Sequence, residues 1–444
     1  MHNMRSYAMR GAVPVLFAAH LLILAVTRQV SALNPALRIP VDVRCHTKKS
    51  NTMKRIILLT QLVFAVFFHC KSQVNEVRFE KDGHFYIYAT VNDTIEGRFL
   101  FDTGASGLYL DSTFIKRHSF IIKTKLDTAR MRGAGATGYK KVLLIKDTTK
   151  IQVGNYFHNF SVAPILKLTD INGENIAGII GNEFIKNQIL SIDNERSVLR
   201  IDTFIDSKKY DEIIPFQYIN GRIYLPVELN IQANQTHKAN LLVDLGCADA
   251  VILNSPYFNS LKSKGVKPQK IVDYTILFGG ALGGNSDGGD FRIKSLILGN
   301  GKIDNPIISF SKDTLGAFSK TNYDGLIGNE ILDRYNYSID YRNQKMYLTK
   351  NSKSEKFFKS SLTGFYAMKT NNSVIVMSIY YQSGAYKNGL RLGDTIVSIN
   401  NKNVKDLSEQ DFNNEMKEEG KQIKLTIIRD NKPKEISFYL KYLL

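Results

Sequence analysis

The chain has 444 residues, of which 43% are hydrophobic and 23% are charged, so its composition is globular, excludes low-complexity bulk and allows two or three domains. The formal net charge of +18 first points to a nucleic-acid or membrane partner. However, residues 1–72 hold ten basic residues and one acidic residue, which leaves 49 basic and 40 acidic residues, a net charge of +9, in the remainder. Because these charges are scattered along the chain, we expect a generally basic surface and no nucleic-acid partner.

The N-terminal region has the features of a targeting sequence. A positively charged segment at 53–55 is followed by an apolar segment at 56–68 and then by small residues before Gln73, an order typical of a secretory signal peptide. We therefore predict a signal peptide at 53–72 and an exported protein, periplasmic or extracellular. The apolar segment is too short for a comfortable membrane span, so no stable span is expected after processing.

The sequence before this signal is open to two interpretations. We predict that residues 1–52 are an upstream extension or leader, and the alternative is that the apolar stretch 12–26 is itself a signal or an anchor. Cys45 and Cys70 fall in the part that processing removes, so the mature chain keeps Cys247 alone. No intrachain disulfide is therefore expected.

The mature chain consists of short alternating apolar segments separated by Gly, Asn and Asp, which predicts a mostly β protein. Two of its segments occur twice. FLFDTGASGLYL at 99–110 has a counterpart in LLVDLGCADAVIL at 241–253, and GIIGNEF at 178–184 has a counterpart in GLIGNEI at 325–331. The order and spacing are nearly the same in both copies, so a unit of about 145 residues is used twice.

A glycine-rich stretch follows the first segment in each copy. Gly133, Gly135 and Gly138 mark it in the first copy, and residues 278–284 form it in the second. An alternating apolar segment comes after each stretch, as expected of a mobile hairpin. The first stretch also matches the spacing of a dinucleotide fingerprint, but that motif requires a strand before it and a helix after it. We therefore expect no cofactor.

Asp102 and Asp244 occupy equivalent places in the two copies, each after an apolar strand and before a glycine-containing turn. If the copies pack about a pseudo-twofold axis, these two side chains face each other. Carboxylates held about 3 Å apart share one proton over a broad pH range. One of them then acts as a general base toward water while the other polarises a carbonyl, without a metal or a covalent intermediate.

The motifs themselves resemble those of pepsin-like and retropepsin-like aspartic peptidases. Residues 101–105, Phe-Asp-Thr-Gly-Ala, look like the family's Asp-Thr-Gly signature, and 179–181 and 326–328 look like its hydrophobic-hydrophobic-Gly element. Residues 133–138 are similar to the glycine-rich flap of retropepsins. The resemblance covers about residues 75–350, and the paired motifs make it specific.

This resemblance implies a mostly β, two-lobed, pseudo-twofold aspartic-protease-like β-barrel fold that is complete in a monomer. It places the first lobe at 74–205 and the second at 206–350. It implies no cofactor and no metal, and it implies the following roles: Asp102 and Asp244 as the catalytic pair, Thr103, Gly104, Leu245 and Gly246 as support of the catalytic loops, and Gly133, Gly135 and Gly138 as the flap.

The second copy departs from the family pattern at Leu245, where the family has Thr. The family's two Thr hydroxyls bond between the lobes, so Thr103 is expected to lose a partner of that kind, at a cost of about 1 kcal/mol. Ala105 and Cys247 also lack the hydroxyl that pepsins direct at a catalytic carboxylate. The lower pKa of the pair is then depressed less, which predicts a pH optimum nearer neutral than that of pepsin.

The sequence after residue 350 belongs to a different unit. A polar linker at 351–360 leads to 361–444, where the run at 384–394 followed by Ile and Asn residues resembles the PDZ pattern of bacterial secreted peptidases. The segment Thr363-Gly364-Phe365-Tyr366 looks like the PDZ loop that receives a peptide C-terminus by strand addition. We predict a small α+β PDZ-like domain whose peptide-binding residues are Gly364, Phe365 and Tyr366. The alternative is a domain that only packs against the lobes.

Two functions from different classes follow from these motifs. The first is a secreted aspartic endopeptidase that hydrolyses protein or peptide substrates, with PDZ-assisted substrate capture. The second is a catalytically inactive aspartic-protease-fold protein that acts as a peptide-binding module. Ser286 in a Gly-Asn-Ser-Asp-Gly pattern and Cys247 beside Asp244 are candidate nucleophiles. We interpret Ser286 as a turn serine, because it lies in the glycine-rich hairpin with no buried strand directly before it. We interpret Cys247 as a packed small residue, because the motif places no His near it.

Overall fold

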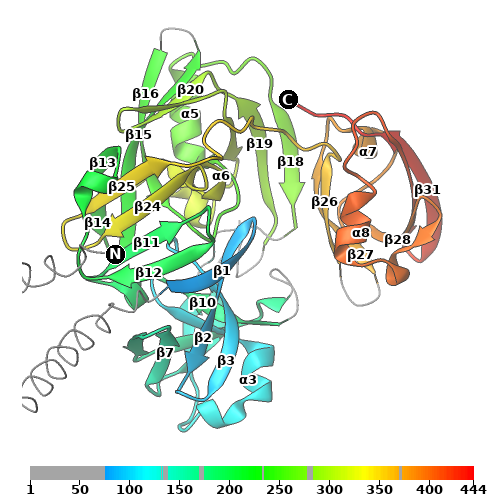
Figure 1. The fold of residues 1–444 in the computed structure, drawn as a ribbon. Helices are drawn as coiled ribbons and strands as arrows, with labels where there is room; N and C mark the ends of the chain where they lie inside the picture. The colour runs from blue at the N-terminus through cyan, green and yellow to red at the C-terminus, as the bar shows by residue number, and fades with distance from the viewer. Residues whose placement is uncertain are drawn as a thin grey trace, which may run out of the picture. The chain divides into compact units, whose positions relative to one another are not determined.

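The computed structural model describes residues 76–131, 133, 139–169, 175–232, 235–277, 284–369 and 373–444. Strands dominate these residues, as predicted, and short helices lie between them (Figure 1). The predicted signal peptide and upstream extension, together with Gly135 and Gly138 of the predicted flap, lie outside the described residues. Within the described ranges no helix has the length and apolar character needed to cross a membrane.

The first lobe is built from strands β1 to β12. Every second side chain of a strand points to the same face, and β2 accordingly buries Phe85, Ile87, Ala89 and Val91 in the core. The elements are β1 (Glu76–Asp82), β2 (His84–Val91), β3 (Ile95–Phe101), β4 (Leu108–Asp111), α3 (Ser112–Arg117), η1 (Ser119–Ile121), β5 (Asp127–Met131), β6 (Lys140–Ile145), β7 (Thr149–Val153), β8 (Tyr156–Phe160), β9 (Ala163–Leu166), β10 (Ile176–Ile180), η2 (Asn182–Ile185), β11 (Ile189–Asp193) and β12 (Val198–Asp202).

The second lobe repeats this plan with longer central strands. Its elements are η3 (Ser207–Lys209), β13 (Glu212–Pro215), β14 (Gln217–Ile219), β15 (Arg222–Gln232), β16 (Gln235–Val243), β17 (Val251–Leu253), α5 (Ser255–Ser263), β18 (Val272–Ile276), β19 (Ser286–Arg292), β20 (Ser295–Leu298), β21 (Gly301–Asp304), β22 (Ile307–Ser311), η4 (Ala317–Ser319), β23 (Gly325–Ile327), α6 (Asn329–Leu332), β24 (Tyr335–Asp340) and β25 (Lys345–Lys350).

In the first lobe, β10 runs between β3 and β4. It is parallel to β3 and antiparallel to β4, so Ile180 lies beside both Phe101 and Leu108. All five residues of β10 are buried. The close packing requires glycine at Gly178, because a Cβ atom there would lie 2.1 Å from the backbone oxygen of Tyr109. This crossing fixes the residues that follow β3.

The second lobe has the same crossing at the equivalent place. β23 runs parallel to β16 and antiparallel to β17, and it places Ile327 beside Val243 and Val251. Gly325 is required there for the same reason as Gly178, because its Cβ would lie 2.2 Å from the backbone oxygen of Ile252. The sequence repeat is therefore a repeat of structure.

Among the described strands, one pair connects the two lobes. β11 of the first lobe pairs antiparallel with β24 of the second, and Ser191 lies opposite Ser338. These serines open the Ser-Ile-Asp sequence that both copies contain. The strands therefore meet symmetrically, each supplying the same residues to the joint.

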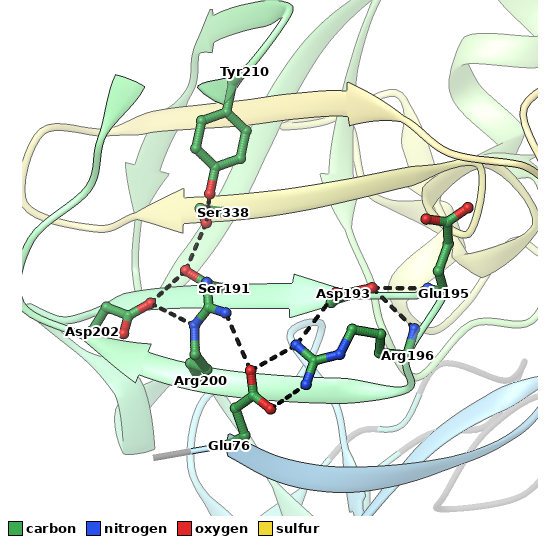
Figure 2. A network of polar contacts seen from close by, with 9 residues as sticks. All are labelled: Glu76, Ser191, Asp193, Glu195, Arg196, Arg200, Asp202, Tyr210 and Ser338. Atoms are coloured by element: carbon green, nitrogen blue, oxygen red, sulfur yellow. Dashed lines mark hydrogen bonds and ion pairs between the residues drawn. The ribbon is translucent and has the colours of Figure 1, made fainter. Parts of the chain in front are cut away.

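Figure 2 shows the polar contacts at this joint. The hydroxyl of Ser338 donates to Ser191 over 2.7 Å, and Ser191 donates to Asp202 over 2.8 Å. At the other end Arg196 binds Glu76 at the start of β1, with Nη1 2.7 Å from Oε1. Arg200 lies 3.6 Å from Glu76 and 3.5 Å from Asp202, so the network connects β1 to the strand pair between the lobes.

The sheets stay open rather than closing into barrels, which refines the predicted fold. One sheet runs from β13 to β5 and the other from β21 to β31, and neither path through the described strands returns to its start. The physical reason is that strands which would close a lobe on itself pair elsewhere: β11 pairs with β24 of the other lobe. β18 likewise pairs with β27 of the C-terminal domain.

The C-terminal domain has a hydrophobic core of its own, which includes Val376, Ile396, Phe412 and Phe438. Helices α7 and α8 cover its sheet, drawn in orange and red in Figure 1. The elements are β26 (Phe365–Lys369), β27 (Val374–Tyr380), α7 (Gly384–Lys387), β28 (Thr395–Ile399), β29 (Lys402–Asn403), η5 (Val404–Asp406), α8 (Glu409–Asn414), β30 (Gln422–Arg429) and β31 (Lys432–Tyr439).

A strand pair also links this domain to the second lobe. β27 pairs antiparallel with β18, and Tyr274 lies opposite Tyr380. The Tyr380 hydroxyl donates to the carboxylate of Asp290 over 2.7 Å, and Ser309 donates to the same carboxylate over 2.7 Å. Burial raises the pKa of Asp290 to about 7. The domain is therefore hydrogen-bonded to the hairpin formed by β18 and β19.

Candidate active site

Asp102 and Asp244 directly follow β3 and β16, at the two strand crossings. The backbone N–H of Asp102 donates to the carbonyl of Ile180 over 2.9 Å, and that of Asp244 donates to the carbonyl of Ile327 over 3.0 Å. Each crossing strand therefore fixes one aspartate, and the two are held in the same way.

The structure brings the two carboxyl groups together between the lobes, close enough that the charge of Asp102 raises the pKa of Asp244. The adjacent glycines show how close the loops are. A Cβ atom on Gly104 would lie 2.7 Å from Oδ2 of Asp244, and one on Gly246 would lie 2.7 Å from Cγ of Asp102. Each glycine thus packs against the carboxyl group of the opposite lobe.

Gly104→Ala is expected to lower the rate of substrate cleavage about 10²-fold, because the added methyl group displaces Asp244 and a misplacement of about 1 Å can cost that much. Gly107→Ala is a matched control in the same loop, since a Cβ there would meet only Glu183, at 3.6 Å. The measurement is kcat/KM on one peptide substrate for both variants. Equal rates for Gly104→Ala and the parent protein would contradict the prediction.

The two carboxyl groups differ in their hydrogen bonds. Oδ1 of Asp102 accepts from the N–H groups of Gly104, at 2.7 Å, and Ala105, at 3.0 Å. Oδ1 of Asp244 accepts from the N–H of Gly246 at 2.8 Å. Hydrogen bonds from backbone N–H groups favour the charged form of a carboxyl group. Asp102 is therefore the better stabilised as a carboxylate.

The pKa of Asp244 is raised well above the usual range of aspartate. Burial between the lobes is the main cause, followed by the negative charge of Asp102 and the hydrogen bond between the two carboxyl groups. Two such groups cannot both ionise readily, so they hold one proton between them. The geometry and the electrostatics together favour a protonated Asp244 in this pair.

Thr103 keeps its role between the lobes, although Leu245 has no hydroxyl. Its Oγ1 donates to the carbonyl of Val243 over 2.7 Å and accepts from the N–H of Leu245 over 3.0 Å. Both Thr103 and Leu245 are almost fully buried, and Leu245 packs in the main hydrophobic core. Thr103 therefore has no hydroxyl partner in the second lobe, as expected, but it makes two hydrogen bonds to the backbone of that lobe.

Two asparagines that the motifs did not predict as site residues support the loops. The side-chain amide of Asn182 donates to the carbonyl of Thr103, and that of Asn329 donates to the carbonyl of Leu245 over 2.8 Å. Oδ1 of Asn182 also accepts from the hydroxyl of Tyr341 over 2.6 Å. The signal was present, because both copies contain Gly-Asn-Glu after the crossing strand.

The predicted flap is only partly described. β5 and β6 pair as a hairpin, with Met131 opposite Lys140, and Gly133 lies between them. Gly135 and Gly138 lie outside the described residues. In the second lobe β18 and β19 form the equivalent hairpin, with Ile276 opposite Ser286.

The other candidate nucleophiles have structural roles. The hydroxyl of Ser286 is buried and donates to Asp313 over 2.6 Å. Burial raises the pKa of the Cys247 thiol well above its usual value, so the reactive thiolate is disfavoured. Among the described residues, no group of three or more His, Cys, Asp or Glu side chains is placed to hold a metal ion.

The predicted PDZ loop lies at the start of β26. Gly364 has a φ of +73°, and a Cβ there would lie 2.0 Å from the Cβ of Ser383, so the loop requires glycine. Phe365 packs in the core of the domain, while the side chain of Tyr366 is exposed. The N–H of Gly364 donates to the hydroxyl of Ser361 over 3.0 Å. This N–H group is therefore paired within the loop itself.

Comparison with known proteins gives two family matches. Residues 87–184 match the family model of the aspartyl protease, and residues 360–440 match that of the PDZ domain. The crystal structure of the aspartic proteinase from Irpex lacteus aligns with 63% of this chain and 98% of its own, with 13% sequence identity and a TM-score of 0.39. The comparison with curated proteins found no match. The chain therefore contains an aspartyl protease-like domain and a C-terminal PDZ domain.

Proposed function

We propose that this protein is an aspartic endopeptidase. The observation that carries the proposal is the contact between Asp102 and Asp244 across the two lobes, with more amide donors directed at Asp102 and a raised pKa at Asp244. This is the arrangement that one base and one acid need at the same water molecule.

In the proposed reaction, the carboxylate of Asp102 takes a proton from water as the water oxygen forms a bond to the carbonyl carbon of the peptide. The π electrons of the carbonyl move to its oxygen, which takes the proton of Asp244. The resulting gem-diol collapses when Asp102 passes its proton to the amide nitrogen and the C–N bond breaks. Asp244 recovers a proton from one of the two hydroxyl groups, so the pair returns to its starting state.

We also propose that the PDZ domain captures substrates and that the protein is exported. The support for capture is the loop at Gly364 and the pairing of β27 with β18, which connects the domain to a hairpin of the second lobe. The support for export is the signal-like sequence at 53–72. A pull-down with peptides that differ only in a free or an amidated C-terminus tests the first proposal, and N-terminal sequencing of the exported protein tests the second.

The direct test of the peptidase is cleavage of denatured casein between pH 3 and 8, with and without a statyl-type inhibitor. Inhibitor-sensitive cleavage is the expected result. If no product forms at any pH on casein or on a peptide library, the protein is not a general endopeptidase, and the inactive peptide-binding module becomes the better assignment.

The pH dependence of cleavage follows from the pKa of Asp244. The reaction requires Asp244 protonated, and its pKa is raised, so activity is present below that pKa and lost as the pH rises through it. The basic limb of the pH–rate profile is therefore expected well above the usual range of aspartate, with an optimum nearer neutral than that of pepsin. A profile of kcat/KM that peaks near pH 2 would contradict this prediction.

A further inference from the structure

His84 and Arg222 occupy equivalent positions in the two lobes. His84 begins β2 and Arg222 begins β15, each directly after a glycine with positive φ, +70° at Gly83 and +75° at Gly221. The strand registers agree as well. Tyr86 lies opposite Leu100, and Tyr224 lies opposite Leu242. Each leucine is two residues before the aspartate of its lobe. Each tyrosine is two residues after His84 or Arg222.

Both side chains cross to the aspartate loop of the opposite lobe. Nδ1 of His84 lies 2.7 Å from the carbonyl oxygen of Gly246, and Nε of Arg222 donates to the carbonyl oxygen of Gly104 over 3.0 Å. A carbonyl oxygen can only accept, so Nδ1 of His84 carries the proton. The two glycines that pack against the carboxyl groups are therefore each fixed by a side chain of the other lobe.

From this symmetry we infer that His84 and Arg222 are positioning residues, which hold the two aspartate loops against each other across the pseudo-twofold axis. The N–H of each glycine binds the carboxylate of its own loop, and its C=O is held by the opposite lobe. A shift of either carbonyl moves the neighbouring N–H and the aspartate that it binds. We call this pair of contacts the cross-lobe clamp; its role in catalysis rests on the proposed function.

The clamp is symmetric in geometry and asymmetric in charge. Arg222 is a permanent cation because its guanidinium group stays protonated in proteins. The charge of Arg222 lowers the pKa of Asp244, against the larger raising effects of burial and Asp102. Cys247 and Tyr323 also lie near Asp244, but burial raises the pKa of both, that of Tyr323 to about 12, so neither changes its charge at neutral pH.

Substitutions that separate position from charge test the clamp. Arg222→Met is expected to lower kcat about ten- to a hundredfold with little change in KM, because the aspartate loop loses its position. It is also expected to move the basic limb of the pH–rate profile to higher pH, because the pKa of Asp244 rises when the cation is removed. Arg222→Lys keeps the charge and is expected to leave the basic limb in place. His84→Leu is expected to lower kcat, and His84→Asn, which keeps a donor near the Nδ1 position, to restore most of it.

Lys302→Met is the matched control, because it removes an exposed positive charge that pairs with Asp304 on the same lobe; its kcat and pH profile are expected to equal those of the parent protein. The 13C titration of the Asp244 carboxyl carbon gives a readout that does not need turnover. The parent protein could fail to cleave any substrate while the pKa of Asp244 in this titration rises in Arg222→Met and not in Arg222→Lys. In that case the peptidase proposal fails and the clamp stands. If cleavage occurs but Arg222→Met shifts neither the titration nor the basic limb, or His84→Asn does no better than His84→Leu, the clamp is refuted.

Discussion

Asp102→Asn is expected to lower kcat/KM on denatured casein by at least about 10²–10⁴-fold, the range by which a positioned general base accelerates a reaction. An amide cannot accept the proton of water, so the first step of the proposed reaction is lost. The fold is expected to remain, because the carbonyl oxygen of asparagine can still accept from the N–H groups of Gly104 and Ala105. The pair also loses the repulsion between its two acidic groups, so the thermal unfolding midpoint is expected to stay or to rise.

The matched control for this substitution is Asp304→Asn. Asp304 lies at the end of β21, pairs with Lys302 over 2.6 Å and has an exposed side chain, so its loss is expected to leave cleavage unchanged. Cleavage by Asp102→Asn at the rate of this control would show that the carboxyl pair does not catalyse the reaction. The peptidase proposal would then be abandoned, whatever the structure of the site.

The site residues that could be predicted from the sequence are those that stand next to each other in a repeated motif. Asp102 and Asp244 could be paired because each follows an apolar strand in two copies with matched spacing. Gly104 and Gly246 follow directly from the same motif. In each case the local sequence determines a local conformation, and the repeat supplies the one long-range relation that is needed.

The cross-lobe contacts were not predictable in the same way. His84 and Arg222 are different residue types at equivalent positions, so the sequence repeat does not indicate them. Their partners are backbone carbonyls, which every residue has. The same holds for Tyr380 on Asp290, which depends on how two domains pack. Sequence patterns report periodicity and local turns, whereas these bonds depend on tertiary distances.

Leu245 shows that a motif residue can change while the hydrogen bonds between the lobes are kept. From the sequence alone, the missing hydroxyl predicts that Thr103 loses a partner between the lobes. In the structure, Thr103 binds the backbone of Val243 and Leu245 instead, and the apolar side chain of Leu245 fills the core. A backbone partner does not depend on the residue type, so a change at Leu245 leaves the bond from Thr103 intact.

Thr103→Val is therefore expected to destabilise the protein by about 2–6 kcal/mol. It removes the partner of two buried groups, the carbonyl of Val243 and the N–H of Leu245, and a buried polar group left without a partner costs about 1–3 kcal/mol. The shape of the side chain is nearly unchanged, so the loss reports the hydrogen bonds. The measurement is the free energy of unfolding from urea denaturation, and Thr103→Ser, which keeps the hydroxyl, is expected to retain most of the stability.

Thr149→Val separates this effect from the general cost of placing valine at a buried threonine. Thr149 is also almost fully buried, but its hydroxyl makes a longer bond of 3.3 Å to the carbonyl of Asp147, two residues before β7 begins. Its loss is expected to cost about 1 kcal/mol. Because Thr103 connects the lobes while Thr149 does not, Thr103→Val alone should also reduce cleavage. Equal losses of stability in the two variants, with cleavage unchanged in both, would mean that the Thr103 bonds do not hold the lobes in their working arrangement.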